Sequence, residues 1–191
     1  MHHGTPAPHS RATRALHWAA ALLVTAAFGL GLMLEDWPRG PQRDFVMMVH
    51  YTLGTIVLGL LLVRLVRRLL VPALGAREPG LAGWAATAMH WSLYAMMLAL
   101  PVTGAFDRWA RGRRLAVFDI VIPPPFPIGG GRIWREAHTY IGWAIAVFVL
   151  LHVAAALWHH FGRRDAVLAR MLPWAARRDG AGSVRLDAHT A

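Results

Sequence analysis

Four long apolar segments limit the folds open to this chain of 191 residues. They cover about residues 13–34, 45–70, 84–106 and 134–161, and each has the roughly 20 residues that a helix needs to cross the hydrocarbon core of a membrane. Their apolar residues run in uninterrupted blocks, whereas a surface helix of a water-soluble protein carries an apolar stripe on one face. The pattern predicts an all-α membrane protein, a bundle of four transmembrane helices over residues 13–161.

Polar segments flank and interrupt this predicted bundle. Residues 1–12 form an N-terminal tail, and residues 162–191 form a basic tail that we expect to lie at the membrane interface. Twelve arginines lie on the side of the two termini and eight on the opposite side. Because positive residues are in excess on the cytoplasmic side, we expect both termini in the cytoplasm. The connection 107–133 is rich in proline and glycine, and we expect it to pack on the protein or the membrane surface.

The net charge of +10 comes entirely from arginine, since the chain has no lysine. These arginines flank the apolar segments, as expected where a chain meets anionic headgroups, so we predict membrane lipid and no nucleic acid as a partner. The chain also has no cysteine. Disulfides, iron–sulfur clusters and covalent attachment of a c-type haem are therefore excluded.

Histidines recur inside the predicted spans, where an imidazole costs free energy unless it has a partner. His50 and His138 both lie near the outer start of a span, whereas His17 and His152 lie in the cytoplasmic half. Two pairs of imidazoles from different helices thus share two depths, as bis-histidine ligation of b-type haem requires. Along the last helix His138 and His152 are roughly 21 Å apart, and His159 lies on the same face.

Other roles for these histidines fit the surrounding residues less well. A lone intramembrane histidine is more often a hydrogen-bonded core residue, but four at matched depths favour ligation. Zinc prefers a tight cluster with carboxylates or thiolates, and the only acid beside a ligand candidate is Glu136. A proton-relay transporter is expected to carry acids in mid-span, and the predicted spans have none there. Gly54 and Gly142, four residues after His50 and His138, leave bare positions for a porphyrin edge.

At these residues the sequence resembles the bacterial cytochrome b561 family, four-helix diheme cytochromes of the inner membrane. The resemblance runs from about Arg14 to Pro173, and the spacing from His138 to His160 is its most specific part. The other matching motifs are Leu16-His17-Trp18, His50 with Gly54, Arg64 with Arg67 and Arg68, His90-x-x-x-Tyr94 and Ala99-Leu100-Pro101-x-x-Gly104.

The resemblance implies two haem b groups and exchange of electrons with ubiquinone. The implied axial ligands are His17, His50, His138 and His152. It also implies a quinone site on the cytoplasmic side, which maps onto Arg77, His90 and His159. A member of the family acts as a superoxide oxidase, which passes an electron from superoxide through both haems to quinone.

Two functions remain open at this point. The first is a diheme cytochrome b that transfers electrons across the inner membrane from an outer-side one-electron donor, superoxide or a redox partner protein, to ubiquinone on the cytoplasmic side. Four outer arginines would raise the local concentration of an anion, although arginines at a membrane edge also serve as plain lipid contacts. They are Arg108, Arg111, Arg113 and Arg114. The alternative is a haem-carrying membrane anchor subunit that links a dehydrogenase or hydrogenase to the quinone pool.

Overall fold

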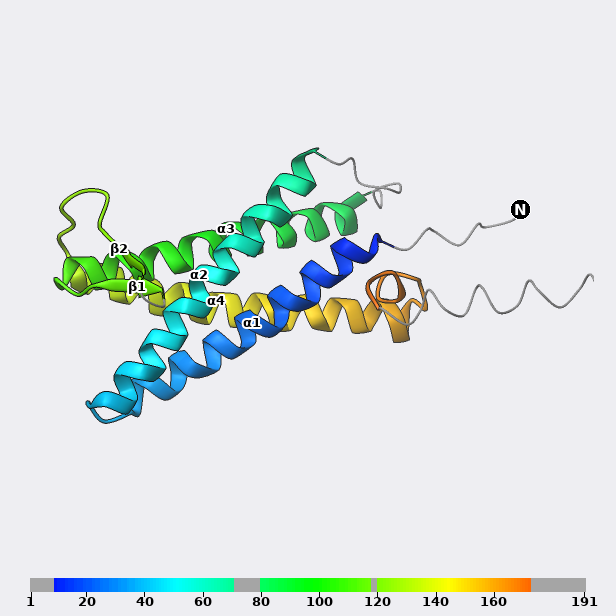
Figure 1. The fold of residues 1–191 in the computed structure, drawn as a ribbon. Helices are drawn as coiled ribbons and strands as arrows, with labels where there is room; N and C mark the ends of the chain where they lie inside the picture. Colours follow the sequence, from blue (N-terminus) through cyan, green and yellow to red (C-terminus); the bar gives the residue numbers. More distant parts are fainter. Residues whose placement is uncertain (1–8, 71–79, 118–119, 173–191) are drawn as a thin grey trace, which may run out of the picture.

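The computed structural model describes residues 9–70, 80–117 and 120–172. Its long helices, shown in Figure 1, are α1 (Arg11–Asp36), α2 (Pro41–Leu70), α3 (Gly80–Ala110) and α4 (Gly131–Leu157). Short elements follow: an antiparallel pair of strands, β1 (Leu115–Val117) and β2 (Ile120–Ile122), a π-helical turn, η1 (Trp158–Gly162), and a 3-10 turn, η2 (Ala169–Met171). Each long helix begins two to four residues before the segment predicted for it.

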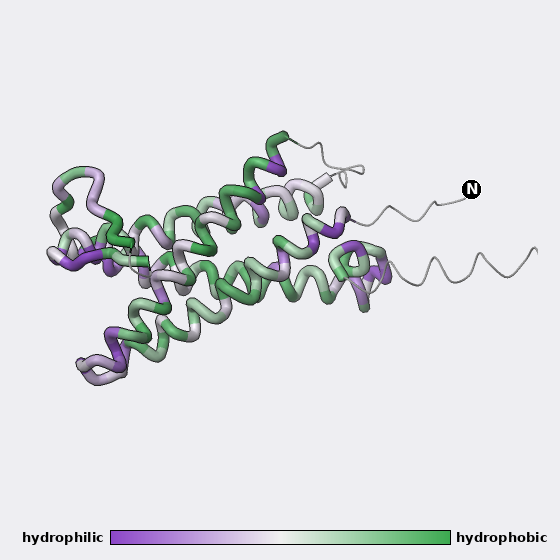
Figure 2. Tube along the Cα trace, in the orientation of Figure 1, coloured by the Kyte–Doolittle hydropathy of each residue, from purple (hydrophilic) through white to green (hydrophobic). Residues whose placement is uncertain are grey.

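The residues of the four helices are mostly apolar along the bundle, and polar residues gather at its two ends (Figure 2). All four helices are long and apolar enough to cross a membrane. Large apolar side chains face outward, such as Leu22 and Leu150, with 71% and 69% of their surface exposed. That exposure would cost free energy in water, whereas lipid tails match it. The predicted fold class, an all-α membrane bundle, is confirmed.

Local chemistry sets several helix ends. Ser10 caps α1, because its Oγ accepts a hydrogen bond from the Thr13 amide at 3.2 Å. α1 stops just before Pro38, which disfavours helical backbone in the residue that precedes it. α2 starts with Pro41, whose fixed φ suits the first helical position. α4 begins after Gly130, whose φ of 73° is left-handed and favours glycine.

The helices pack as two antiparallel pairs joined by one further contact. α1 packs closely on α2, α3 packs on α4, and α2 packs on α3 (Figure 1). In the described part of the chain, α4 approaches α1 and α2 closely at few points at most. Since helices in direct contact lie about 8–10 Å apart, α4 is held less tightly to the α1–α2 pair than to α3.

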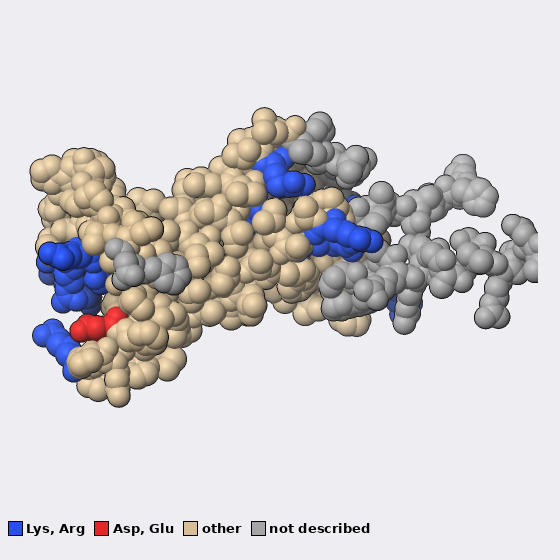
Figure 3. Space-filling view, in the orientation of Figure 1, with Lys and Arg blue, Asp and Glu red and all other residues tan. Residues whose placement is uncertain are grey.

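The bundle has two ends, which we name by what lies there. The terminal end holds the start of α1 and the last described residues, and the hairpin end holds the α1–α2 turn and the β1–β2 strands (Figure 1). Arginines gather at both ends, with an uncharged belt between them (Figure 3). This charge distribution matches a chain whose two ends meet lipid headgroups.

The α3–α4 connection differs from a simple loop. α3 continues through Pro101 to Ala110, so the proline lies inside the helix and does not end it. The strands that follow are tied to it, because Trp109 Nε1 donates to the Ile122 carbonyl at 3.1 Å. Leu115 of β1 is buried. These contacts pack the connection on the protein itself.

The segment after η1 folds back onto the start of α1. Trp18 Nε1 donates to the Met171 carbonyl at 2.8 Å, and Arg14 Nη1 donates to the Leu172 carbonyl at 3.0 Å. Burial, with Arg170 and Arg14 nearby, lowers the pKa of His9 beside this contact. The remainder of the predicted interfacial tail, residues 173–191, lies outside the described residues.

Candidate functional site

The structure brings His50 and His138 together near the hairpin end. His50 lies on α2 and His138 on α4, and their ring centres are 6.0 Å apart with an angle of 76° between the ring planes. Each ring is part-buried between helices. The two residues that were assigned to one depth from the sequence are thus neighbours in space.

Backbone carbonyls fix the orientation of both rings. His50 Nδ1 lies 2.9 Å from the Ala27 carbonyl oxygen, and His138 Nδ1 lies 2.9 Å from that of Leu100. A carbonyl only accepts, so each Nδ1 must carry the hydrogen and each Nε2 keeps its lone pair. A second-shell hydrogen bond of this kind typically accompanies histidines that bind a metal.

Two glycines make room for these rings. A Cβ at Gly104 would lie 2.9 Å from His138 Cε1, and a Cβ at Gly31 would lie 3.3 Å from His50 Cε1. Both glycines stand on the helix that supplies the carbonyl, α3 for Gly104 and α1 for Gly31. The sequence analysis did not find this role. At Gly54, by contrast, an added Cβ would meet nothing within 4 Å, which leaves open space beside His50.

The structure also brings His17 and His152 together, nearer the terminal end. His17 on α1 and His152 on α4 have ring centres 6.3 Å apart, with 61° between the ring planes. Arg64 Nη2 donates to His17 Nδ1 at 3.3 Å. A donor at Nδ1 favours the tautomer with hydrogen on Nε2, so His17 must exchange this contact before its Nε2 can bind a metal.

His90 is a third imidazole at this level. Its ring centre lies 5.5 Å from that of His152, and its Nδ1 donates to the Ala86 carbonyl at 2.6 Å. His90, His152 and His17 therefore form a cluster on three helices, α3, α4 and α1. The sequence analysis placed His90 near this depth but not against His152.

His159 does not continue the face of α4 that holds His138 and His152, where a regular helix would place it. It falls in η1, where the π-helical turn changes the register of the residues after Leu157. Its Nδ1 donates to Asp165 Oδ2 at 2.5 Å. Burial opposes the charge on Asp165, but the hydrogen bonds from His159 and the Val167 amide hold the pKa of this carboxyl below its ordinary value. Arg77, the third predicted quinone residue, lies outside the described residues.

The spacing of the two pairs fits a single iron between each. Two imidazoles on opposite faces of one iron, with metal–nitrogen bonds of about 2 Å and each nitrogen about 1.1 Å from its ring centre, have ring centres about 6.2 Å apart. The observed distances are 6.0 Å for His50 and His138 and 6.3 Å for His17 and His152, both nearer to this value than the 5.5 Å of the His90–His152 pair. The loose approach of α4 to α1 and α2 is what a flat cofactor between them needs. The residues therefore fit two b-type haems.

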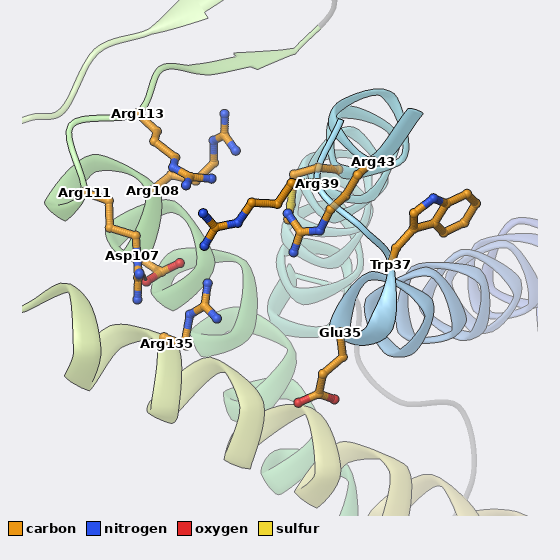
Figure 4. A pocket seen from close by; sticks show the side chains of 10 residues that line it. Glu35, Trp37, Arg39, Arg43, Asp107, Arg108, Arg111, Arg113 and Arg135 are labelled. Atoms are coloured by element: carbon orange, nitrogen blue, oxygen red, sulfur yellow. Dashed lines mark hydrogen bonds and ion pairs between the residues drawn. The ribbon is translucent and has the colours of Figure 1, made fainter. Parts of the chain in front are cut away.

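The arginines of the hairpin end line a pocket of about 350 Å³ (Figure 4). It lies between the α1–α2 turn and the ends of α3 and α4 that face it. Its arginines are Arg39, Arg43, Arg108, Arg111, Arg113 and Arg135. Glu35 and Asp107 supply its carboxylates, and Trp37 and Met47 complete the lining.

Comparison with known proteins identifies the family of the chain. Residues 8–174 match the family described as prokaryotic cytochrome b561. The chain is 27% identical to cytochrome b561 homolog 2 of Escherichia coli K12 over 181 residues, 88% of this chain and 93% of the relative. It is 27% identical to the probable superoxide oxidase CybB of Yersinia pestis over 166 residues, 83% of this chain and 92% of the relative.

A third relative, cytochrome b561 homolog 1 of Escherichia coli K12, is 29% identical over 164 residues, which are 83% of this chain and 93% of the relative. The family match covers all four helices and every histidine of the two pairs. The chain belongs to the prokaryotic cytochrome b561 family, and it is a multi-pass b-type cytochrome of the bacterial inner membrane that functions in electron transfer.

Proposed function

We propose that the protein is a diheme cytochrome b that transfers electrons across the membrane, from a one-electron donor at the hairpin end to ubiquinone at the terminal end. The observation that carries the proposal is the presence of two histidine pairs at two depths, with ring centres 6.0 and 6.3 Å apart, so that each pair could hold one haem iron. When bound, each haem supplies a metal centre that accepts and releases one electron.

The chain's own residues set where the two centres would lie. His50 and His138 would ligate the centre near the hairpin end, and His17 and His152 the centre nearer the terminal end. The helical rise between the two ligands of α4 separates the levels by roughly 21 Å. One helix thus holds one ligand of each centre, which fixes the spacing of the electron path.

Superoxide is the donor that the hairpin end favours. Six arginines face two carboxylates in its pocket, and such an excess of positive charge raises the local concentration of an anion. Arg108, Arg111 and Arg113 belong to this pocket. A superoxide oxidase activity is also in the name of the Yersinia pestis relative. Two superoxide anions would each lose one electron to become dioxygen, and one quinone would take up both electrons and two protons.

His90 and His159 are the residues we propose for the quinone site, together with Arg77. His90 touches the His152 ring, so a quinone beside it would lie next to a haem ligand. His159 donates to Asp165 near the membrane face, where it can relay a proton from water. The excess of arginine at the terminal end supports a cytoplasmic location for both termini, and hence cytoplasmic reduction of quinone.

A haem count and a donor assay test the proposal. The purified protein should contain two haems b per chain, with sharp reduced α-bands, and His138→Ala should remove one of them. A protein without a reduced α-band, or a His138→Ala variant that keeps both haems, contradicts the ligand assignment. Superoxide should then drive reduction of ubiquinone by the protein alone. If reduction occurs only with a copurifying subunit, the protein is instead the membrane anchor of a dehydrogenase or hydrogenase.

A further inference from the structure

The arginine pocket of the hairpin end lies directly above the histidine pair of that end. Met47 precedes His50 by three residues on α2, and Arg135 precedes His138 by three residues on α4. Residues three apart share one face of a helix and differ in height by about 4.5 Å. The pocket therefore lies about one helical turn closer to the hairpin end of the bundle than the His50 and His138 rings.

The pocket has more cationic donors than the protein itself uses. Arg111 pairs with Asp107 at 2.5 Å, and Arg43 donates to the Leu34 carbonyl at 3.0 Å. Within the described residues, no hydrogen bond or ion pair involves the side chains of Arg39, Arg113 or Arg135. Each guanidinium offers five N–H donors in a planar fork that suits a carboxylate.

The pocket has room for a ligand larger than a diatomic anion. Its volume is about 350 Å³, whereas one water molecule occupies about 30 Å³ of the liquid. A surplus of positive charge spread over the α1–α2 turn, α2, the end of α3 with the residues after it, and α4 suits an anion with more than one acidic group (Figure 4). A haem carries two propionate carboxylates on one edge of its ring. In the proposed function, the haem ligated by His50 and His138 would bring this dianion close to the pocket.

We propose that the arginine pocket holds the propionates of the haem ligated by His50 and His138, with Arg135 as the main positioning residue. The proposal rests on the proposed function, because it needs that haem. Two carboxylates offset only part of the positive surplus, so the pocket still attracts an anionic donor.

The terminal end repeats the same spacing. Arg14 precedes His17 by three residues, as Arg135 precedes His138. Arg14 is 8% exposed, and its Nε is buried without a hydrogen-bond partner in the described chain. A buried guanidinium nitrogen costs free energy unless it is paired. In both cases an arginine lies one turn nearer the membrane face than a ligand histidine, where a propionate would satisfy it.

The test is a redox titration of the complete protein, with Arg135→Gln against the control Arg132→Gln. Arg132 lies on the same helix, but its side chain is 90% exposed and pairs with Glu136 outside the pocket. The haem missing from His138→Ala identifies the component to follow. The positive charge of Arg135 stabilises the reduced haem, which carries one more negative charge than the oxidised haem. At a fixed potential, Arg135→Gln should therefore raise the ratio of oxidised to reduced haem about tenfold. This change equals a midpoint potential lower by about 59 mV. Arg132→Gln should leave the ratio within a factor of two of the unchanged protein.

Further arms separate the outcomes. Arg135→Lys, which retains the charge, should recover most of the shift, and if Arg135→Gln fails to fold, Arg39→Gln of the α1–α2 turn replaces it. Equal potentials in Arg135→Gln and Arg132→Gln overturn the proposal while the haem assignment stands. Absence of any haem that depends on His138 would refute the proposed function itself.

Discussion

Replacing Gly104 with alanine tests how closely the structure fits the ligand role of His138. The added Cβ would lie 2.9 Å from His138 Cε1 and 3.0 Å from Nδ1. Carbon atoms in ordinary contact lie about 3.5–4.0 Å apart, so the ring must retreat by about 0.5–1 Å. That movement would weaken the hydrogen bond from Nδ1 to the Leu100 carbonyl, now 2.9 Å long, and turn Nε2 away from its partner.

The expected effect is selective loss of the haem near the hairpin end. Functional groups must hold their geometry to about 0.5 Å, and disturbing a second-shell partner typically costs about 10- to 100-fold in metal affinity. This corresponds to about 1.4–2.8 kcal/mol. The fold should not suffer, because alanine favours a helix over glycine by about 1 kcal/mol.

The measurement is haem content per chain and the rate of haem transfer to excess apomyoglobin. Gly59→Ala is the matched control, since its Cβ would meet nothing within 4 Å. Gly31→Ala, with its Cβ at 3.3 Å from His50, should give an intermediate rate. The reasoning is refuted if Gly104→Ala holds the haem that depends on His138 as tightly as Gly59→Ala does.

Two further predictions concern the terminal end. Trp18→Phe removes the donor to the Met171 carbonyl, so it should weaken docking of the last described segment by about 1 kcal/mol and speed tryptic cleavage after Arg170 about fivefold; an unchanged cleavage rate would show that this bond does not hold the segment. The lowered pKa of Asp165 means that its contacts stabilise the segment at pH values above the ordinary 3.8 and are lost as the pH falls through the lowered value. The Val167 amide donates to Asp165 Oδ1 at 3.1 Å, so its protection from hydrogen exchange should fall when Asp165 becomes protonated at low pH. This fall is measured after correction for the intrinsic pH dependence of exchange. In Asp165→Asn it should be absent.

The spans and the depth of each histidine could be predicted from the sequence because the membrane leaves few alternatives. Backbone groups in lipid must bond within their own helix, so each apolar segment has one fold and a fixed rise per residue. Counting residues from the ends then placed His50 beside His138 and His17 beside His152, and the structure brings both pairs together.

Contacts between helices could not be predicted in the same way. The carbonyls of Ala27 and Leu100 belong to α1 and α3, which carry neither His50 nor His138, and nothing in the sequence marks them. Gly104 belongs to the Pro101-x-x-Gly104 motif, but that spacing does not indicate that the His138 ring packs against the glycine. The π-helical turn at His159 also departs from the regular period on which the single stripe was based.

The two histidine pairs differ in how far the packed helices already orient their rings for binding a metal. The difference follows from the hydrogen-bond partners of the histidines. His50 and His138 each donate to a carbonyl of a packed neighbour, so their rings are held in the tautomer that binds iron. His17 instead accepts from Arg64, and the His90 ring centre lies 5.5 Å from that of His152. A ligand set that must exchange a hydrogen bond before it binds loses part of its affinity to that rearrangement. In the proposed function, one of these two partners, the third imidazole His90, is a group that could supply protons to a quinone at the terminal end.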